Sequence, residues 1–162
     1  MSKKKKLIRI ISTFIIFAVV FMLIQRLLMP KYVDDVVEGN LIKEYYQEEN
    51  KDYDVIFIGD CEVYENFSPV KLWTEYGINS YIRGSAEQYI WQSYYLLEDT
   101  LRYHKPQVVV FNIQSLQFNK SQSEAYNRMT LDGMKWSMSK VNAINASMKE
   151  NEHFIELSLI HI

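Results

Sequence analysis

A long apolar run near the amino terminus is the strongest hydropathy pattern in the chain. Residues 10–24 contain only two polar side chains, Ser12 and Thr13, and lysines and an arginine precede them. Residues 10–29 number 20, and a helix of that length measures about 30 Å, which matches the hydrocarbon core of a bilayer. The pattern predicts a cytoplasmic basic flank and transmembrane anchor over residues 1–29.

A cleavable signal peptide would show a similar apolar run. Signal peptides end in small residues at the cleavage site, whereas residues 22–29 read Met-Leu-Ile-Gln-Arg-Leu-Leu-Met. This segment favours an uncleaved anchor. Basic flanks stay on the cytoplasmic side of a membrane. We therefore expect a single-pass protein of the cell membrane with a cytoplasmic amino terminus and an extracytoplasmic domain.

Residues 30–52 show no sustained apolar period. They contain seven acidic side chains and three lysines, a composition typical of a solvated spacer. We therefore predict an acidic stalk over this range. Leu41, Ile42, Tyr45 and Tyr46 leave a second interpretation open, namely a short helix that docks on the domain.

Beyond residue 52, apolar runs of strand length alternate with helical stretches. The expected strands are residues 53–58, 78–82 and 107–113, and the expected helices between them are residues 69–76 and 86–104. Alternating strands and helices predict a parallel sheet covered on both faces. The predicted fold class is therefore α/β, over residues 53–156: a three-layer, flavodoxin-like parallel sheet that is incomplete, preceded by one transmembrane helix.

Several residues indicate where the helices begin and end. Ser68 and Ser85 are expected N-caps, and Gly77 is expected to end the first helix. Asp132 is expected to cap a later helix with apolar residues at helical spacing. Those residues are expected to pack rather than bind a ligand: Met134, Met138, Val141, Ile144 and Met148.

The charge of the chain is distributed unevenly. Residues 1–30 carry six basic side chains and no acid, so the net charge of −2 leaves −8 for the rest. An acidic domain argues against nucleic acid as a partner. A single cysteine excludes an internal disulfide. One cysteine and three histidines at these spacings do not indicate a zinc site either. We expect no metal and no cofactor.

Reactive or polar residues follow each predicted strand. The first strand leads into Gly59-Asp60-Cys61, the second into Arg83-Gly84-Ser85 and the third into Asn112-Ile113-Gln114-Ser115. Carboxyl ends of parallel strands meet at one edge of a sheet. Cys61 would supply a nucleophile there, Gly84 a backbone N–H and Gln114 a carboxamide donor, which is the makeup of an acyl-transfer site. A small buried cysteine that only fills the strand end is the alternative.

These strand ends resemble the sequence blocks of the SGNH (GDSL-type) hydrolases. Gly59-Asp60-Cys61 stands where the family has Gly-Asp-Ser, and Gly84 stands where the second block contributes an amide. Residues 112–115 would align with the third block, with Gln114 as oxyanion donor but without the block's glycine and aspartate. The resemblance covers residues 53–150. The anchor and residues 123–132 are similar to the membrane-tethered branch, which includes alginate acetylation proteins and the D-alanyl transfer protein of teichoic acid synthesis.

The resemblance implies a membrane-anchored, outward-facing acyl transferase or esterase. Its substrate would be a cell-envelope polysaccharide or teichoic-acid-like polymer, and a membrane-bound acyl-transfer protein would be a possible partner. Cys61 would replace the nucleophilic serine, and Asp60 would fix the turn. The family's Asp-x-x-His block, which supplies the base, has no counterpart here, because His104 and His153 lie in polar surroundings expected to be solvated.

The last six residues, 157–162, read Leu-Ser-Leu-Ile-His-Ile. One reading frame of a widely used transposon-based sequencing adapter encodes the same hexapeptide. We interpret it as a non-native tail and the chain as an amino-terminal fragment, which would lack its base and be inactive as it stands. A natural apolar carboxyl-terminal strand is the alternative.

A non-catalytic polysaccharide-binding or scaffold protein of the envelope is the second functional hypothesis. Aromatic residues often stack on sugar rings, and the domain is rich in them. Six are candidates for contact with a sugar chain: Tyr64, Tyr81, Tyr89, Trp91, Tyr94 and Tyr95. The reactivity of the Cys61 thiol at neutral pH would separate an enzyme from a binding protein.

Overall fold

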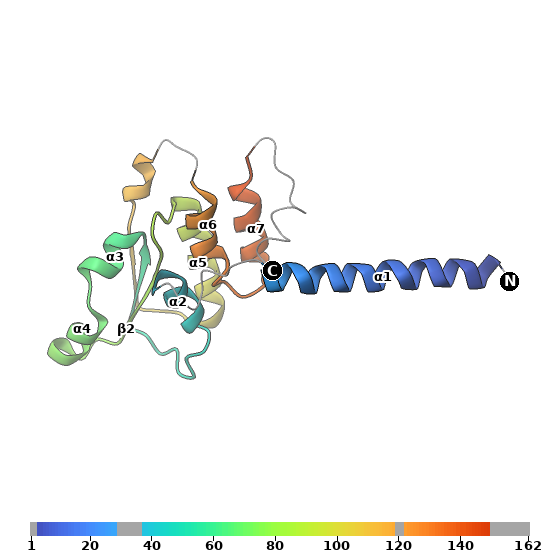
Figure 1. Cartoon of the computed structure of the whole chain (residues 1–162). Coiled ribbons are helices and arrows are strands. Elements are labelled where there is room, and N and C mark those ends of the chain that lie inside the picture. The colour runs from blue at the N-terminus through green and yellow to red at the C-terminus, as the bar shows by residue number, and fades with distance from the viewer. Residues whose placement is uncertain (1–2, 29–36, 119–121, 150–162) are drawn as a thin grey trace. The chain divides into compact units, whose positions relative to one another are not determined.

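The computed structural model describes residues 3–28, 37–118 and 122–149 (Figure 1). Helix α1, Lys3–Leu28, has 26 residues and is about 39 Å long. Its stretch Lys3–Gln25 is long and apolar enough to cross a membrane, which confirms the predicted amino-terminal helix. The helix belongs to one compact unit, and the described residues from 37 onward form a second.

The second unit is built on a three-stranded parallel sheet. Strand β1, Val55–Gly59, lies between β2, Ser80–Gly84, and β3, Val108–Phe111. Val55 is in register with both Ser80 and Val108. The order β2-β1-β3 is that of the first three strands of a flavodoxin-like sheet, so the predicted α/β class is confirmed.

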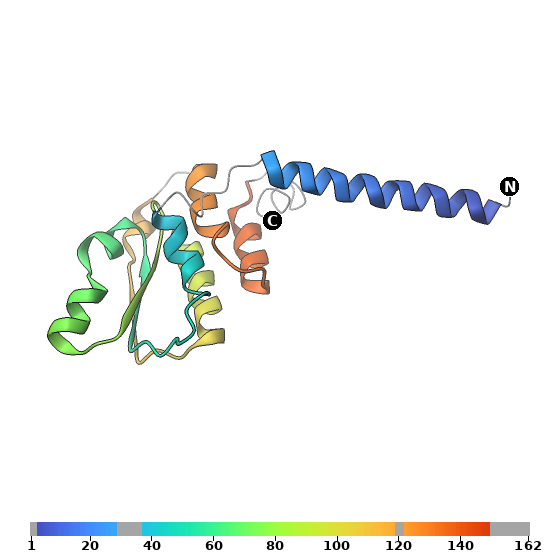
Figure 2. The same ribbon diagram turned by 60° about the horizontal axis from the view of Figure 1, so that its bottom comes forward.

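Helices cover both faces of the sheet (Figures 1 and 2). Helices α3, Cys61–Asn66, and α4, Pro69–Tyr76, cover one face. Helix α5, Ile90–Tyr103, covers the other together with Tyr45 and Tyr46, which follow helix α2, Val37–Glu44. The remaining helical elements are η1, Gln114–Gln117, α6, Glu124–Leu131, and α7, Met138–Ser147. Helices α6 and α7 pack on α2 and α5, so the central layer of helices is covered in turn.

Successive side chains of β1 point to opposite faces of the sheet, which explains why both faces are apolar. Ile56 and Ile58 point toward α5 and the residues after α2, where Tyr45 and Tyr46 pack on them. Phe57 points the other way and is buried with side chains of α3 and β2. A strand buried on both faces reads as an unbroken apolar run, which is why β1 could be predicted from sequence.

The segment 37–46 belongs to the domain, which corrects the predicted stalk over residues 30–52. Ile42 and Tyr45 are fully buried and Tyr46 is 8% exposed. The Tyr81 hydroxyl donates a hydrogen bond of 3.1 Å to the Leu41 carbonyl. The docking interpretation therefore holds for α2, because its apolar side chains cover a sheet face that water would otherwise reach.

Strand β2 begins later than predicted, at Ser80 rather than Ile78. Gly77 ends α4 with a left-handed φ of 67°, and the Ile78 N–H donates to the Leu72 carbonyl. These bonds are typical of a helix C-cap, so Ile78 completes the cap. The Ser68 cap and the Gly77 helix end are confirmed.

Helix α5 begins at Ile90 rather than Ala86, because Ser85 is not its N-cap. The Ser85 hydroxyl bonds Gln88 and Thr130 instead. The Tyr89 N–H donates to the Gln92 side chain at 2.8 Å, which satisfies one of the free donors at the helix start. The helix therefore starts one turn later than its sequence indicates.

The polar stretch after β3 contains a helix that the sequence analysis missed. Ser123 caps α6, and Asp132 is its C-cap residue rather than the cap of the next helix. Ser137 caps α7. Met134 is 3% exposed and packs in the core, but Met138 is 61% exposed. The predicted methionine stripe is therefore wrong at Met138, because the helix starts there.

His104 is half-buried rather than solvated. Its Nε2 lies 2.6 Å from the Tyr53 carbonyl, which ties the end of α5 to the chain before β1. His153 and the predicted tail over residues 157–162 lie outside the described residues. The interpretation of that tail stays a prediction.

Candidate active site at the carboxyl ends of the strands

The turn after β1 is organised by Asp60. Its carboxylate accepts a hydrogen bond of 3.1 Å from the Glu62 N–H and so caps α3. The same oxygen, Oδ1, accepts a 2.9 Å bond from the Asn112 side chain. Asp60 therefore holds the ends of β1 and β3 together, in agreement with its predicted role in the turn.

Two glycines let these strand ends meet closely. A Cβ at Gly59 would lie 2.5 Å from the Asn112 Cβ. A Cβ at Gly84 would lie 2.6 Å from Cγ2 of Val63 and 2.9 Å from the Gly59 oxygen. Only hydrogen fits at either position. Packing of α3 against the strand ends is thus one physical reason for Gly84, whereas its role as an amide donor stays a prediction.

Cys61 is the first residue of α3 and is partly buried. Burial raises the pKa of its thiol above the ordinary value, and the carboxylates of Asp60, Glu65 and Glu62 raise that pKa further. A backbone hydrogen bond to the thiol lowers this pKa but does not offset burial and the acids. The thiol is therefore protonated at neutral pH, and a nucleophilic role requires a base.

Gln114 lies beyond the end of β3, as the first residue of η1, and is exposed. Its backbone N–H donates a 2.7 Å bond to Asn112 Oδ1. In the described part of the chain, its side chain has no hydrogen bond. The structure thus brings Cys61 and Gly84 to adjacent strand ends, joined to β3 through Asn112, while the carboxamide of Gln114 projects into solvent. The hydrogen bonds of Asn112 to Asp60 and Gln114 were not predicted from the sequence.

Among residues 3–28, 37–118 and 122–149, no histidine lies at this edge, and the carboxylates near Cys61 are those of Asp60, Glu62 and Glu65. His104 is the one histidine described, and it bonds Tyr53, which precedes β1. His104 therefore lies at the opposite edge of the sheet from Cys61. In the same ranges, no three His, Cys, Asp or Glu side chains come together as a metal site.

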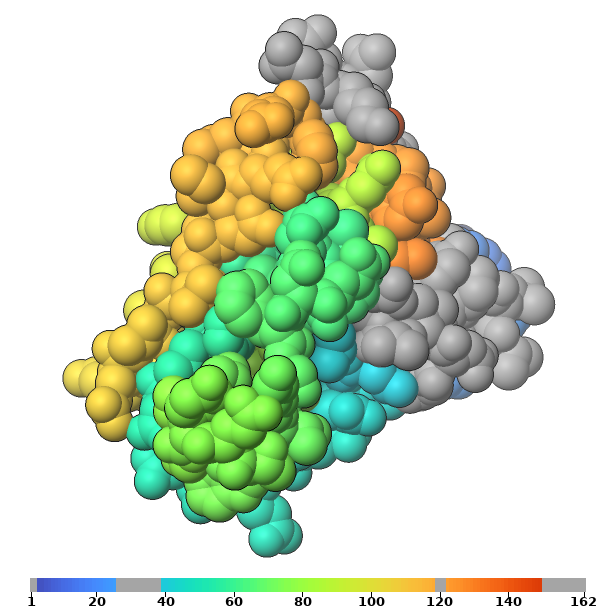
Figure 3. Space-filling view, turned by 90° about the vertical axis from the view of Figure 1, so that its left-hand side faces the viewer, coloured from blue at the N-terminus to red at the C-terminus, as the bar shows by residue number. Residues whose placement is uncertain are grey.

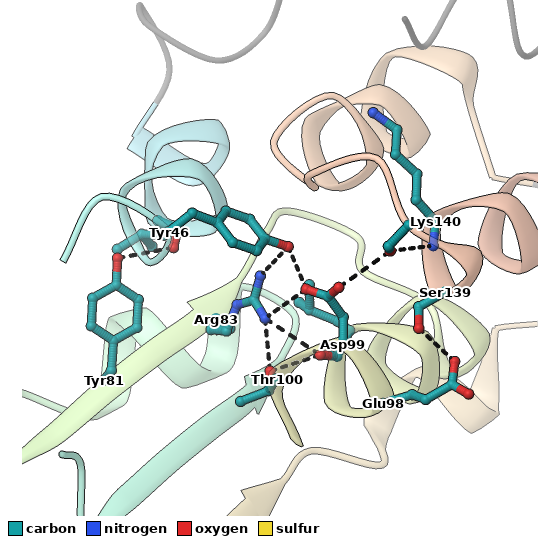
Figure 4. A network of polar contacts seen from close by, with 11 residues as sticks. Tyr46, Tyr81, Arg83, Glu98, Asp99, Thr100, Ser139 and Lys140 are labelled. Carbon is teal, nitrogen blue, oxygen red and sulfur yellow. Dashed lines mark hydrogen bonds and ion pairs between the residues drawn. The ribbon is translucent and has the colours of Figure 1, made fainter. Parts of the chain in front are cut away.

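A buried ionic network that was not predicted from the sequence lies between β2 and α5 (Figure 4). Arg83 of β2 and Asp99 of α5 are both fully buried and 3.4 Å apart. Arg83 donates to Thr100 at 2.7 Å and to the Tyr46 hydroxyl at 2.8 Å, and Tyr46 donates to Asp99. The guanidinium also lies 4.1 Å from the centre of the Tyr45 ring. The network joins the residues after α2 to β2 and α5.

The six aromatic residues of the binding hypothesis do not form one surface. Tyr64 and Tyr81 line one cavity, and Tyr89 and Trp91 line another. Tyr94 and Tyr95 contact each other, with ring centres 5.1 Å apart. A single sugar-stacking face made of all six is therefore not supported.

The raised thiol pKa predicts slow alkylation of Cys61. In the folded full chain in a non-ionic detergent, iodoacetamide should react more slowly at neutral pH than in urea, because less thiolate is present. The rate should rise with pH and level off at a higher pH than in the unfolded chain. Intact mass measured against time gives both rates. A folded rate that exceeds the unfolded one at neutral pH would contradict the environment described for Cys61.

Loss of the Asp60 carboxylate should weaken the turn. Asp60→Ala removes both hydrogen bonds that the carboxylate accepts, and we expect about 1–2 kcal/mol of lost stability in urea unfolding. Asp60→Asn is the matched control, because its carbonyl can still accept from Glu62 and should retain most of the stability. Equal losses in the two variants would show that the capping oxygen is not what stabilises this turn.

Comparison of the chain with protein-family models, curated proteins and solved structures finds no match. The fold and site themselves define the class: an α/β domain with a cysteine at the end of its central strand, in a chain with an apolar amino-terminal helix. The SGNH resemblance rests on the motif residues alone.

Proposed function

We propose that this chain belongs to a membrane-anchored acyl transferase or esterase of SGNH-like type, with Cys61 as the acyl-accepting nucleophile. The observation that carries the proposal is the junction of three strand ends around Asp60. That carboxylate accepts hydrogen bonds from the first turn of α3 and from Asn112, and Gly84 packs against Val63 and the backbone oxygens of Gly59 and Asp60. In the proposed mechanism the backbone amides of Cys61 and Gly84, with the Gln114 carboxamide turned in from solvent, stabilise the oxyanion.

The proposed step is attack of the Cys61 sulfur on the carbonyl carbon of an ester or thioester. A carbon–sulfur bond forms, the alkoxide or thiolate of the donor leaves, and the thiol proton passes to a base. Because the described residues provide no histidine base at this edge, the chain as it stands should accept an acyl group slowly and release it more slowly still.

The proposed setting is the outer face of the cell membrane. Helix α1 can span a bilayer, and its lysine-rich start is typical of a cytoplasmic flank. An outward-facing domain would meet envelope polymers, such as a polysaccharide or a teichoic-acid-like chain, and a membrane-bound acyl donor protein is the proposed partner.

An activated ester tests the proposal. With p-nitrophenyl acetate, the full chain in detergent should release nitrophenol in a burst that corresponds to a single acyl group per chain, followed by little turnover. Cys61→Ala should abolish the burst. Cys61→Ser should reduce it strongly, because a hydroxyl is a weaker nucleophile without a base. A burst that persists in Cys61→Ala would refute Cys61 as the acceptor.

Non-catalytic binding is the second candidate function, and the raised pKa of Cys61 favours it. In that case Cys61 fills the strand end and the aromatic cavities hold a ligand. Cys61→Ala would then leave ligand binding intact, and the ester would produce no burst in any variant.

A further inference from the structure

A cavity of about 560 Å³ lies at the outer edge of β2. Three helices form its walls: α2 contributes Leu41 and Glu44, α3 contributes Tyr64 to Asn66, and α4 contributes Pro69. Its floor is β2, from Ser80 to Ile82. Figure 3 views this side of the molecule, where α3 and α4, in green, lie beside α2, in cyan. The volume is within the range of small-molecule sites.

The lining combines aromatic rings with negative charge. Tyr64, Phe67 and Tyr81 supply rings, and Glu44 and Glu65 supply carboxylates. No lysine or arginine is among the described residues that line it. Ring faces and carboxylates both attract cations, whereas an anion would find no positive partner among these residues.

The floor of the cavity contains a polar group without a partner. Ser80 lines the cavity and is 6% exposed. Its hydroxyl makes no hydrogen bond within the described residues. A buried hydroxyl that lacks a partner costs stability, and a ligand that donates to it would remove that cost.

The cavity walls are held in place by contacts independent of any ligand. The Tyr81 hydroxyl donates to the Leu41 carbonyl and so fixes α2 against β2. Phe67 stacks on Phe57 of β1, with ring centres 4.4 Å apart. The Glu44 charge is close enough to help burial raise the pKa of Tyr81. A site whose walls are already formed loses little entropy when it binds.

We propose that this cavity binds a small organic cation through its ammonium group. The carboxylates of Glu44 and Glu65 and the aromatic rings would hold the charge, and the Ser80 hydroxyl would accept a hydrogen bond from an N–H. The site is separate from Cys61 and does not rest on the proposed acyl transfer. An amino sugar and an aromatic amine both carry the required group.

Two matched ligand pairs test the charge requirement on the full chain in a non-ionic detergent at mildly acidic pH. Titration calorimetry compares glucosamine with N-acetylglucosamine, and benzylamine with benzyl alcohol. The charged member of at least one pair should bind about tenfold tighter than its neutral partner. The pair that shows the difference indicates whether the cavity prefers an amino sugar or an aromatic amine. Equal binding within both pairs, or no binding at all, would overturn the proposal.

Variants then locate the site. Glu44 and Glu65 are exposed, so Glu44→Gln combined with Glu65→Gln should fold and bind the ammonium ligand about tenfold more weakly. Glu75→Gln is the matched control, because Glu75 is an exposed acid of α4 outside the cavity. Loss of affinity in Glu75→Gln equal to that in the double variant would overturn the assignment.

Ser80→Ala separates binding from folding. Removal of a buried hydroxyl without a partner should leave stability unchanged or raise it. The same change should weaken ammonium binding, because the ligand loses an acceptor. Unchanged affinity in Ser80→Ala would remove the hydroxyl from the proposed site, and lower stability would contradict its lack of a partner.

Discussion

Arg83→Met is expected to destabilise the domain by about 3–5 kcal/mol, because it leaves the Asp99 carboxylate buried without its cation. Arg83 and Asp99 are both fully buried. The Tyr46 hydroxyl also loses its donor, since it accepts from Arg83. Domains of this size have total stabilities of about 5–15 kcal/mol, so the variant should be close to unfolding. Urea unfolding of the full chain in detergent measures the change.

Two further variants keep this prediction testable if Arg83→Met does not fold. Arg102→Met is the matched control, because Arg102 is exposed on α5 and should change stability by less than about 0.5 kcal/mol. The combined change Arg83→Met and Asp99→Leu should recover part of the loss, because no unpaired charge remains. A double variant that is less stable than Arg83→Met would contradict the account of this pair.

Gly84→Ala is expected to cost about 1–3 kcal/mol by overpacking. The new methyl group would lie 2.6 Å from the Val63 side chain and 2.9 Å from the Gly59 oxygen. The side chain can shift, but the backbone oxygen cannot move without disturbing the turn at Asp60. We therefore expect slower acylation of Cys61 as well as lower stability in urea unfolding.

Val63→Ala separates the two clashes that are expected to cause the Gly84→Ala effect. Combined with Gly84→Ala, this change removes the side-chain clash but not the clash with Gly59, so the two losses should combine less than additively. Gly77→Asn is the control, because a Cβ at Gly77 meets nothing within 4 Å and asparagine tolerates its left-handed backbone. A loss in Gly77→Asn as large as in Gly84→Ala would indicate a general effect of replacing glycine.

The sheet could be predicted from sequence because its strands are apolar and their connections are helical. The order of β1, β2 and β3 follows from parallel connections of one hand. The end of β2 was missed because a charged residue there contradicts an apolar pattern. Arg83 lies in the strand only because Asp99 neutralises it, and that partner is distant in sequence.

Local capping signals identified some helix boundaries and not others. Ser68 does cap α4, since nothing else competes for its hydroxyl. Ser85 and Asp132 have the right chemistry, but other partners occupy them: Thr130, which is distant in sequence, for Ser85, and Arg128, one helical turn earlier, for Asp132. A cap is therefore predictable only where the side chain has no better partner elsewhere in the fold.

The candidate site was predictable as a set of strand ends but not as a geometry. The sequence indicated that Cys61 and Gly84 would lie at one edge, and parallel register brings their strand ends together. It did not indicate that Val63 would fill the space beside Gly84, or that the Asn112 amide would bind Asp60. Neither contact leaves a periodic pattern in the sequence.

The central claim is that Cys61 lies in a site that stabilises the oxyanion of acyl transfer. Acylation by an ester passes through an oxyanion, whereas alkylation by iodoacetamide does not. Both reactions need the thiolate, so the acylation rate divided by the alkylation rate at Cys61 does not depend on the fraction of thiolate. Measured by peptide mass spectrometry, this ratio should be at least about tenfold higher in the folded chain than in urea. A folded ratio equal to or below the unfolded one would contradict an acyl-transfer site at Cys61.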